Sequence, residues 1–431
     1  MKSYFYKLIY KYLSIYIRPE DSLVEIDPKN NFLSEKYSNK TILNSKSLNY
    51  KNDLKSVQES KPDFILLNGN IHYERDIQDF LVTLKNGCST NTRLVITYYS
   101  NLWKPMIVLS TWLGLRKKSI ETNWISHEDI ANLLLLTDYE VVRVENKILL
   151  PIYLPLMSSF FNRYISPLPF FKHFNLVNIL IARPILQSNL KNPSVSIVVA
   201  ARNEEGNIKN ILDRIPKMGP DDELIFVEGN STDNTWNKIL ELSKQYSPKL
   251  NIKTAQQDGK GKGDAVRKGF SLASKEILMI LDADLTVPPE DLPRFYNAIK
   301  DGKGEFINGS RLVYPMEKEA MRFFNLLGNK FFALAFSYVL GQKFKDTLCG
   351  TKVISRENYK KLEKNRNYFG DFDPFGDFDL IFGAARMGLK IVEVPIIYRE
   401  RTYGTTNISR WKHGVILLAM LIFAARKIKF I

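Results

Sequence analysis

Short apolar runs alternate with segments of helical periodicity along the N-terminal half of this 431-residue chain. Runs rich in β-branched and other apolar residues predict strands, and apolar positions three and four apart predict a helix between two of them. We predict strands at Leu23–Ile26, Asp63–Leu67, Arg93–Tyr98 and Glu140–Glu145, and a helix at Ile77–Lys85. Strands that alternate with helices are typical of a parallel, doubly wound sheet.

The C-terminal half shows the same alternation more clearly. Buried strands are predicted at Ser196–Ala201, Leu224–Glu228, Ile252–Thr254 and Ile277–Leu281, and helices at Ile208–Ile215, Thr235–Tyr246 and Asp264–Ser274. Polar clusters follow three of these strands, at residues 202–205, 228–233 and 282–284. Because ligands of such sheets bind at the carboxyl ends of the strands, we expect a binding site there.

A polar segment, Gln187–Pro193, separates the two alternations. We predict one α/β domain over residues 1–190, a second over 191–409, and an amphipathic helix over 410–431. The apolar part of that helix, Val415–Ala425, is too short to span a bilayer. Its basic neighbours favour a helix on an anionic membrane surface, and a helix docked on its own domain is the alternative. These neighbours are Arg410, Lys412, Arg426, Lys427 and Lys429.

Composition allows two or three packed domains, with 45% hydrophobic residues and a formal net charge of +15. A basic chain suits nucleic acid, anionic lipid or a phosphorylated substrate, and charge alone does not choose among them. The two cysteines, Cys88 and Cys349, exclude a disulfide framework and a thiolate zinc site. Lysines interrupt the apolar residues of Met1–Arg18, so we expect no secretory signal and a cytoplasmic protein.

Asp282-Ala283-Asp284 comes directly after the predicted strand Ile277–Leu281. Two carboxylates so placed can face one hard cation, and Mg²⁺ is commonly held by one or two carboxylates plus substrate phosphates. Such an ion would neutralise a diphosphate leaving group. A solvated turn is the alternative, since Asp-x-Asp is common by chance, but the position after a buried strand favours a metal site.

Lys260–Gly269 (KGKGDAVRKG) is a basic, glycine-rich segment that opens a helix. Lysine and a helix N-terminus suit phosphate, although the spacing is not that of a Walker A loop and a solvated loop is the alternative. Cys349, in Asp346–Gly350, has no partnered histidine in the sequence, so we expect a small buried residue rather than a nucleophile. The aromatic stretch Phe323–Tyr338 is interpreted as core, a lipid groove or a membrane-facing helix pair.

The order of motifs in the C-terminal half resembles the family 2 glycosyltransferases, and more closely the dolichyl- and polyprenyl-phosphate sugar synthases. The resemblance covers residues 193–412 and is carried by SIVVAARNEEGNI, VEGNSTDNT, GKGDAVRKGF, LDADLTVPPEDL, NGSR, DTLCGTKVISR, DFDLIFGAARMGLKIVEVPI and RTYGTTN. It implies a GT-A fold, a nucleotide-diphosphate sugar as donor and Mg²⁺ or Mn²⁺ as cofactor. The implied acceptor is a polyprenyl phosphate or a cell-surface glycan, at the inner face of the cell membrane.

The resemblance also implies roles at matching positions. These are Glu204 and Glu228 at the base and ribose, Lys262 and Asp264 near the nucleotide, Asp282 and Asp284 on the metal, and Arg311 and Arg401 on phosphate oxygens. Asp377 and Asp379 match an acidic pair of which one is the base or positions the acceptor, and we favour Asp379. The alternative is that both aspartates lie in the solvent-exposed first turn of a helix, where acidic residues are favoured.

Glu228-Gly229-Asn230-Ser231 departs from the family, which has two aspartates before Gly-Ser-Thr-Asp. Because of this departure, the sequence does not choose among uridine, guanosine and thymidine as the nucleoside of the donor. A lipid phosphate acceptor needs positioning by arginines, whereas a sugar hydroxyl needs a carboxylate base. In-line attack at the anomeric carbon would invert its configuration.

Residues 15–185 resemble a class I methyltransferase, through KPDFILLNGNIHYERDIQDFLVTLKNGCSTNTRLVITYY. The glycine-rich loop expected after the first strand is absent, which argues against binding of S-adenosylmethionine. Glu25 and Asp27 are the residual candidates for contacts with that cofactor. We therefore expect a degenerate, structural or regulatory Rossmann-like domain in which His72 is a loop residue. A bifunctional methyltransferase and glycosyltransferase is the alternative.

Two further classes of protein stay open from the sequence. A nucleotidyltransferase also uses paired carboxylates and a Gly/Lys-rich loop, but that loop would follow the first strand, where AARNEEGN stands. A basic membrane- or nucleic-acid-binding protein would concentrate lysine and arginine without an acidic rim. The acidic clusters after the strands would repel nucleic acid unless a metal intervened, so we expect no nucleic-acid partner.

Overall fold

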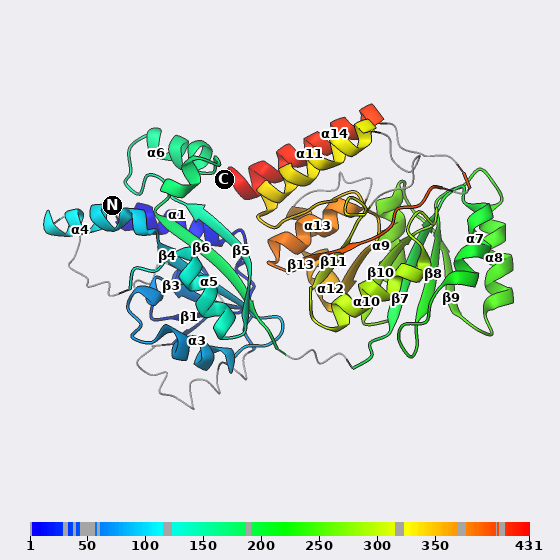
Figure 1. Cartoon of the computed structure of the whole chain (residues 1–431), viewed down its shortest axis with the longest axis horizontal. Coiled ribbons are helices and arrows are strands. Elements are labelled where there is room, and N and C mark those ends of the chain that lie inside the picture. The colour runs from blue at the N-terminus through cyan, green and yellow to red at the C-terminus, as the bar shows by residue number, and fades with distance from the viewer. Residues whose placement is uncertain are drawn as a thin grey trace. The chain divides into compact units, whose positions relative to one another are not determined.

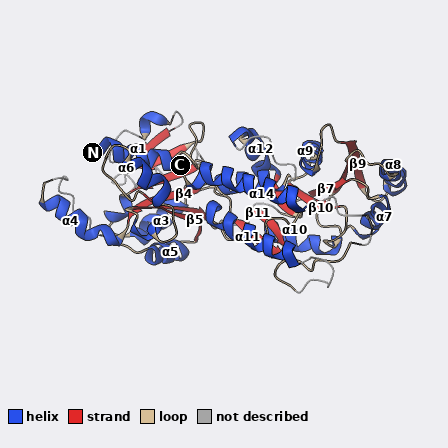
Figure 2. Cartoon of the chain, turned by 90° about the horizontal axis from the view of Figure 1, so that it is seen from above, coloured by secondary structure: helices blue, strands red, loops and turns tan. Residues whose placement is uncertain are grey.

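The computed structural model describes residues 2–28, 33–37, 40–43, 57, 61–114, 123–186, 191–314, 323–368, 376–401, 403–404 and 410–431. The chain divides into two compact units (Figure 1). Unit 1 comprises Met1–Gln187 and Arg426–Ile431, and unit 2 comprises Ser188–Ala425. Each unit contains one sheet with helices around it, as the colouring by secondary structure shows (Figure 2).

The sheet of unit 1 has the order β2-β1-β3-β4-β6-β5. Its strands are β1 (Leu23–Ile26), β2 (Lys40–Leu43), β3 (Phe64–Asn68), β4 (Arg93–Tyr99), β5 (Tyr139–Lys147) and β6 (Val177–Pro184). The first four are parallel, but β6 is antiparallel to both β4 and β5. The expectation of a wholly parallel sheet is therefore wrong at this edge, because the sequence gives no signal for strand direction.

Helices cover both faces of this sheet. The helices of unit 1 are α1 (Lys2–Leu13), α3 (Ile77–Lys85), α4 (Lys104–Trp112), α5 (His127–Leu136) and α6 (Met157–Phe160). Alternate residues of β3 enter different cores: Ile65 packs with the core that includes α3 and α5, and Leu66 with the core that includes α1. Burial on both faces explains why the run is continuously apolar rather than alternating.

Unit 2 has a seven-stranded sheet of order β13-β11-β12-β10-β7-β8-β9. Its strands are β7 (Val195–Ala201), β8 (Glu223–Glu228), β9 (Asn251–Gln256), β10 (Ile277–Asp282), β11 (Phe306–Ser310), β12 (Lys352–Ser355) and β13 (Ile391–Pro395). Strands β7 to β10 are parallel, as predicted, and β12 runs antiparallel between β10 and β11. The parallel strands thus share one carboxyl edge.

The helices of unit 2 are α7 (Glu205–Arg214), α8 (Thr235–Tyr246), α9 (Lys262–Leu272), α10 (Leu292–Lys300), α11 (Phe323–Leu340), α12 (Arg356–Lys364), α13 (Asp377–Arg386) and α14 (Arg410–Ala424). On α11, Phe336 is buried against Phe378 and Phe382 of α13, whereas Phe331 and Leu334 are exposed. One side of the helix formed by the aromatic stretch is therefore part of the core, and another side is exposed. Among the described helices, none has the length and apolar content needed to cross a bilayer.

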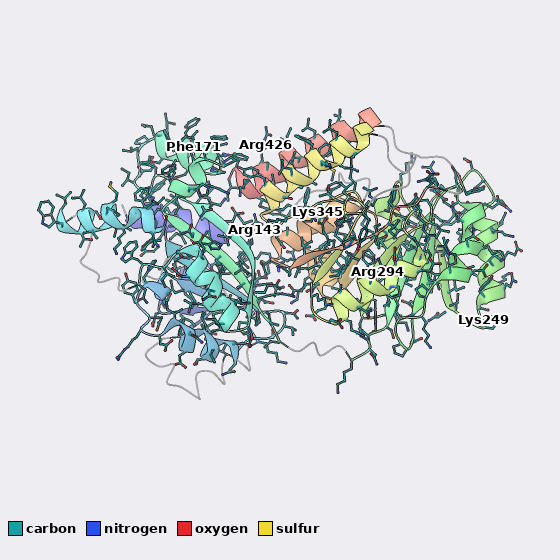
Figure 3. All side chains as sticks on the ribbon, in the orientation of Figure 1. Arg143, Phe171, Lys249, Arg294, Lys345 and Arg426 are labelled. Carbon is teal, nitrogen blue, oxygen red and sulfur yellow. The ribbon has the colours of Figure 1, made fainter. Side chains whose placement is uncertain are left out.

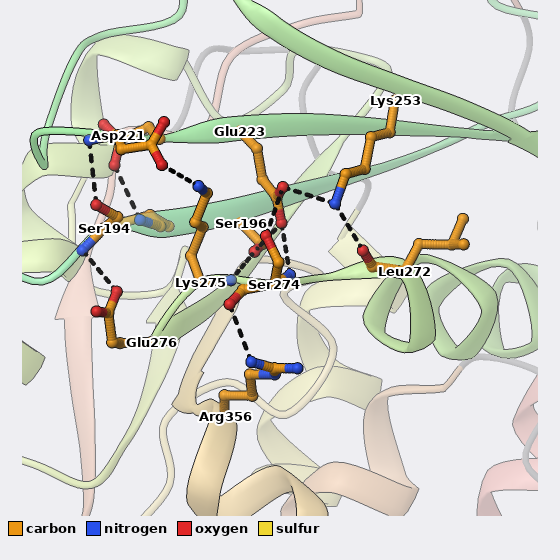
Figure 4. A network of polar contacts seen from close by, with 12 residues as sticks. Ser194, Ser196, Asp221, Glu223, Lys253, Leu272, Ser274, Lys275, Glu276 and Arg356 are labelled. Carbon is orange, nitrogen blue, oxygen red and sulfur yellow. Dashed lines mark hydrogen bonds and ion pairs between the residues drawn. The ribbon is translucent and has the colours of Figure 1, made fainter.

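The amino ends of the parallel strands of unit 2 are held together by a buried carboxylate (Figure 4). Glu223 Oε1 accepts from Ser196 Oγ at 2.6 Å and from the Ser274 backbone N–H at 2.7 Å, and its Oε2 lies 2.8 Å from Lys253 Nζ. Burial opposes ionisation, but these donors lower the pKa of Glu223 to about 2. This network lies at the edge opposite the predicted binding site.

Candidate functional site

At the carboxyl edge of the sheet of unit 2, three of the strands are followed by a residue with unusual backbone dihedrals. Asn203, Asn230 and Leu285 have φ of 57°, 55° and 56°, in the left-handed region, and they follow β7, β8 and β10. Asparagine tolerates this region, but leucine does not adopt it readily. Surrounding contacts hold Leu285, which is buried, in this conformation. The polar clusters predicted after these strands are thus presented by tightly turned backbone.

Asp282, the last residue of β10, forms an ion pair with the first residue of α9. Lys262 Nζ lies 2.5 Å from Asp282 Oδ1. Burial raises the pKa of Asp282, but Lys262, with Lys352 and Arg311 further away, holds the pKa below its usual range. The backbone of Gly350 leaves no room on the other side, since a Cβ there would lie 2.1 Å from Asp282 Oδ2 and 2.3 Å from Lys262 Nζ.

Asp284 is held by two donors from different segments. Arg401 Nη2 donates to Asp284 Oδ2 at 2.5 Å, and Thr286 Oγ1 donates to Asp284 Oδ1 at 2.8 Å. Arg401 Nη1 also lies 3.8 Å from Glu204 Oε1. The structure therefore brings together three of the predicted residues, Glu204, Asp284 and Arg401, from segments far apart in the sequence.

Glu204 is buried just before α7, and its ionisation is disfavoured. Burial raises the pKa of Glu204 to about 7, and the negative charges of Asp284 and Asp233 add to the rise. The hydrogen bond from Asn207 Nδ2, at 2.7 Å, and the charge of Arg401 oppose it. A carboxyl group whose pKa lies near neutral pH, at the carboxyl edge of a parallel sheet, is typical of a functional site.

Glu228 and Asp264 are both held by backbone donors. Glu228, at the end of β8, accepts from the Ser231 N–H at 2.5 Å and from Gln256 Nε2 at 3.1 Å. Burial opposes the shift, but these bonds lower its pKa. Asp264 accepts from the Gly259 N–H at 2.7 Å and so closes the glycine-rich loop in front of α9. Asp264 thus shapes the loop that carries Lys262.

Arg311 lies deeper than expected for a ligand of phosphate. Its Nε and Nη2 donate to Asp346 at 2.7 and 2.9 Å, and its guanidinium lies over the ring of Tyr398. Asp346 is fully buried, a partner that sequence reasoning missed although it stands in the motif DTLCG. The pair fixes the loop that leads to Gly350. Cys349 in that loop is buried, as predicted, and burial raises the pKa of its thiol to about 12.

Asp379 lies in the first turn of α13, beside two arginines. Arg366 Nε donates to Asp379 Oδ2 at 2.8 Å, and Arg267 Nη1 of α9 lies 3.9 Å away from the same oxygen. Gly376, with φ of 71°, begins α13, and a Cβ there would lie 2.5 Å from Gly263 Cα. The two helix N-termini therefore touch. The side chain of Asp377 lies outside the described residues.

No group of three or more His, Cys, Asp or Glu side chains within the described ranges is arranged to hold a metal ion by itself. Asp282 and Asp284 nevertheless supply carboxylate oxygens at one strand end, the donors that Mg²⁺ and Mn²⁺ prefer. Both carboxylates are now paired with cationic side chains. Two carboxylates fit a site whose remaining ligands are phosphate oxygens, and they do not fit an ion held by protein alone.

Comparisons with known proteins find similarity over the residues of unit 2. Residues 196–363 match the model of the family described as glycosyl transferase family 2. Dolichol-phosphate mannosyltransferase of Pyrococcus furiosus is 31% identical over 50% of this chain and 59% of its own length. Dolichyl-phosphate hexose transferase of Haloferax volcanii is 28% identical over 51% of this chain and 89% of its own length. Among solved structures, glucosyl-3-phosphoglycerate synthase of Mycobacterium tuberculosis has a TM-score of 0.39 at 18% identity, over 55% of this chain and 81% of that one.

The match to the family described as glycosyl transferase family 2 thus lies entirely within unit 2. Both of these relatives are named as sugar transferases. The chain spans 59% of the length of the Pyrococcus relative, so the comparison concerns this domain rather than the whole of that protein.

Proposed function

We propose that unit 2 transfers a sugar from a nucleotide-diphosphate sugar to a polyprenyl phosphate. The observation that carries the proposal is the pairing of both carboxylates after β10 with cations from other segments, Asp282 with Lys262 and Asp284 with Arg401. Cations and carboxylates gathered at one edge suit a diphosphate with a divalent ion, because each charge then finds an opposite one. A simple surface turn needs neither pairing.

Asp282 and Asp284 would hold Mg²⁺ or Mn²⁺, which supplies charge neutralisation to the diphosphate. Side chains of unit 2 would act on the substrate beside this ion. Lys262 and Arg401 are placed to exchange their carboxylate partners for phosphate oxygens, so that negative charge on the departing nucleoside diphosphate meets fixed cations. Glu228 and Glu204 would accept hydrogen bonds from the nucleoside, with Asp264 keeping the loop of Lys262 in shape.

The acceptor is proposed from the names of the relatives, which are dolichyl-phosphate sugar transferases. A phosphate monoester is already anionic near neutral pH, so it needs orientation rather than deprotonation. The arginines beside Asp379 suit that role. Attack of the acceptor oxygen on the anomeric carbon, opposite the breaking bond to the diphosphate, inverts the configuration. We propose a location at the inner membrane surface, where such a lipid acceptor is reached.

For unit 1 we propose a methyltransferase-type Rossmann domain without methyl transfer. The insertion of β6 between β4 and β5 supports that fold. Both ring nitrogens of His72 are engaged: Nδ1 lies 2.7 Å from the Asn123 carbonyl oxygen, and Nε2 accepts from the Tyr99 N–H at 2.9 Å. A histidine bound on both sides is a poor proton acceptor for a substrate.

The test uses the full chain with a panel of nucleotide sugars, Mn²⁺ and a short-chain polyprenyl phosphate. We expect transfer with one donor, loss of transfer on chelation, and loss in Asp282→Asn. The control is Asp301→Asn, which changes an exposed carboxylate that lies 3.9 Å from Lys303 Nζ. Transfer that persists in Asp282→Asn at the wild-type rate would refute the assignment of the carboxylate, and an absence of transfer with every donor would refute the function.

A further inference from the structure

Unit 1 carries an apolar helix, α4, in which Ile107 is partly buried against the core and the other large apolar side chains are exposed. None of the nine residues of α4 is buried, although Met106, Val108, Leu109 and Trp112 are among them. Trp112 is 80% exposed. In both views α4 extends away from the strands of its unit (Figure 1, Figure 2). Large apolar side chains gathered on an exposed helix mark a surface that binds a partner.

A second exposed apolar segment lies next to the base of this helix. Residues 152–174 hold Leu156, which is 89% exposed, and Phe170, which is 71% exposed. Phe170 contacts the rings of Phe171 and Phe174 rather than the core, and Figure 3 labels Phe171 in this region. The segments meet where Trp103 Nε1 donates to the Phe174 carbonyl oxygen at 2.7 Å. We call residues 102–113 and 152–174 together the aromatic surface.

The two stretches of sequence that contain the aromatic surface carry side-chain charges of one sign. The sequence has no aspartate or glutamate between Asp79 and Glu121, and none between Glu145 and Glu204. Within the aromatic surface the charged residues are Lys104, Arg163 and Lys172. A protein partner does not require that acids be absent over such lengths, whereas an anionic bilayer repels them and attracts lysine and arginine.

Another exposed apolar pair in the same unit shows the contrast. Leu135 and Leu136, at the end of α5, are exposed too, but Glu128 and Asp129 begin that helix and Asp138 follows it. Exposed leucines with acids nearby are ordinary surface residues. Aromatic side chains with only basic neighbours are typical of segments that lie in the interface of a membrane.

We infer that the aromatic surface of unit 1 binds the interfacial region of an anionic lipid bilayer. A nine-residue helix is about 13 Å long, less than half of the roughly 30 Å hydrocarbon thickness, so α4 enters one leaflet and does not span. Trp112, Phe170 and Leu156 enter among the acyl chains, and Lys104 and Lys172 remain at the phosphates. This binding does not rest on the proposed transfer reaction.

The test is co-sedimentation of the full chain with vesicles, without donor sugar or polyprenyl phosphate. One set of vesicles is phosphatidylcholine, and the other contains phosphatidylglycerol as well. We expect stronger binding to the anionic vesicles, which weakens as salt is raised from about 0.1 to about 0.5 M. The paired substitution Trp112→Ser with Phe170→Ser lowers the partition coefficient by at least about tenfold, because both side chains lose their apolar contact. Lys172→Glu weakens binding to the anionic vesicles and leaves binding to the phosphatidylcholine vesicles unchanged.

Leu135→Ser is the matched control and leaves binding unchanged, because Leu135 lies outside the aromatic surface. All variants replace exposed residues, and equal melting temperatures check that they are folded. The inference is overturned if the wild-type chain binds neither vesicle, or if the paired variant binds as the wild type does. It is also overturned if the wild-type chain self-associates without lipid and the paired variant does not, since the surface would then join two copies.

Discussion

Arg401 Nη2 donates a hydrogen bond to Asp284 Oδ2 at 2.5 Å, although 117 positions separate the two residues in the sequence. The same guanidinium lies 3.8 Å from Glu204, so one cation lies between two carboxylates of the candidate site. An arginine in this position keeps the two acids together, and in the proposed reaction it would be available to a phosphate group.

Arg401→Ala should lower the rate of sugar transfer by about 100-fold, because one fixed donor to the leaving diphosphate is lost. Stability should change by less than about 1 kcal/mol, since the pair is partly exposed. The control is Arg294→Ala, which removes an exposed arginine paired at 3.4 Å with Asp291 (Figure 3). Steady-state kinetics and thermal melting separate the two effects. Equal transfer by both variants would contradict the role of Arg401.

Gly350→Ala should separate Lys262 from Asp282, because the new methyl group would lie 2.1 Å from the carboxylate and 2.3 Å from the amine. We expect transfer to fall by at least about tenfold, with a ΔΔG of unfolding of about 1–3 kcal/mol from overpacking. The matched control is Gly328→Ala on α11, where nothing lies within 4 Å of the added carbon. If Gly350→Ala transfers sugar at the rate of the control, the close approach of the Gly350 backbone to Asp282 and Lys262 is not needed for the reaction.

Glu204 should make the chain less stable as pH rises. Its pKa is raised to about 7 in the folded chain and lies near 4.3 when unfolded, so the folded state holds the extra proton between these values. Stability is therefore lost as pH rises through this window, and Glu204→Gln should recover on the order of 2–3 kcal/mol at pH 8 but little at pH 4. Urea unfolding at both pH values measures this. A variant that is equally stabilised at the two pH values would exclude the titration of Glu204 as the cause.

Glu223 should act in the opposite direction. Its pKa is lowered to about 2, so its stabilisation is full above the unfolded pKa near 4.3 and is lost as pH falls toward 2. We expect Glu223→Gln to cost on the order of 2–3 kcal/mol at pH 7, with a smaller difference from the wild type at pH 3. The exposed Glu241→Gln, which changes a pair with Lys238, is the control. A cost that does not depend on pH would show that packing, rather than charge, makes Glu223 important.

The local elements were predictable because each depends on neighbours in the sequence. The helices Ile77–Lys85 and Thr235–Tyr246 occur as predicted, and Ile277–Leu281 extends by one residue to Asp282. The strand β6 was missed because its apolar run follows a proline-rich aromatic segment that obscures the pattern. The antiparallel direction of β6 and β12 depends on pairing with distant strands, and no residue type encodes it locally.

The sequence by itself determined the alternation of strands and helices and the acids that follow the strands, because periodicity and turn chemistry act over a few residues. Only the tertiary structure decided which cation meets which acid: Lys262 meets Asp282, Arg401 meets Asp284, and Arg311 meets the buried Asp346. It also decided that Trp112 is exposed while other aromatic residues, such as Phe336, are buried. Ion pairing and burial depend on which segments the fold brings together, and spacing along the chain does not specify that.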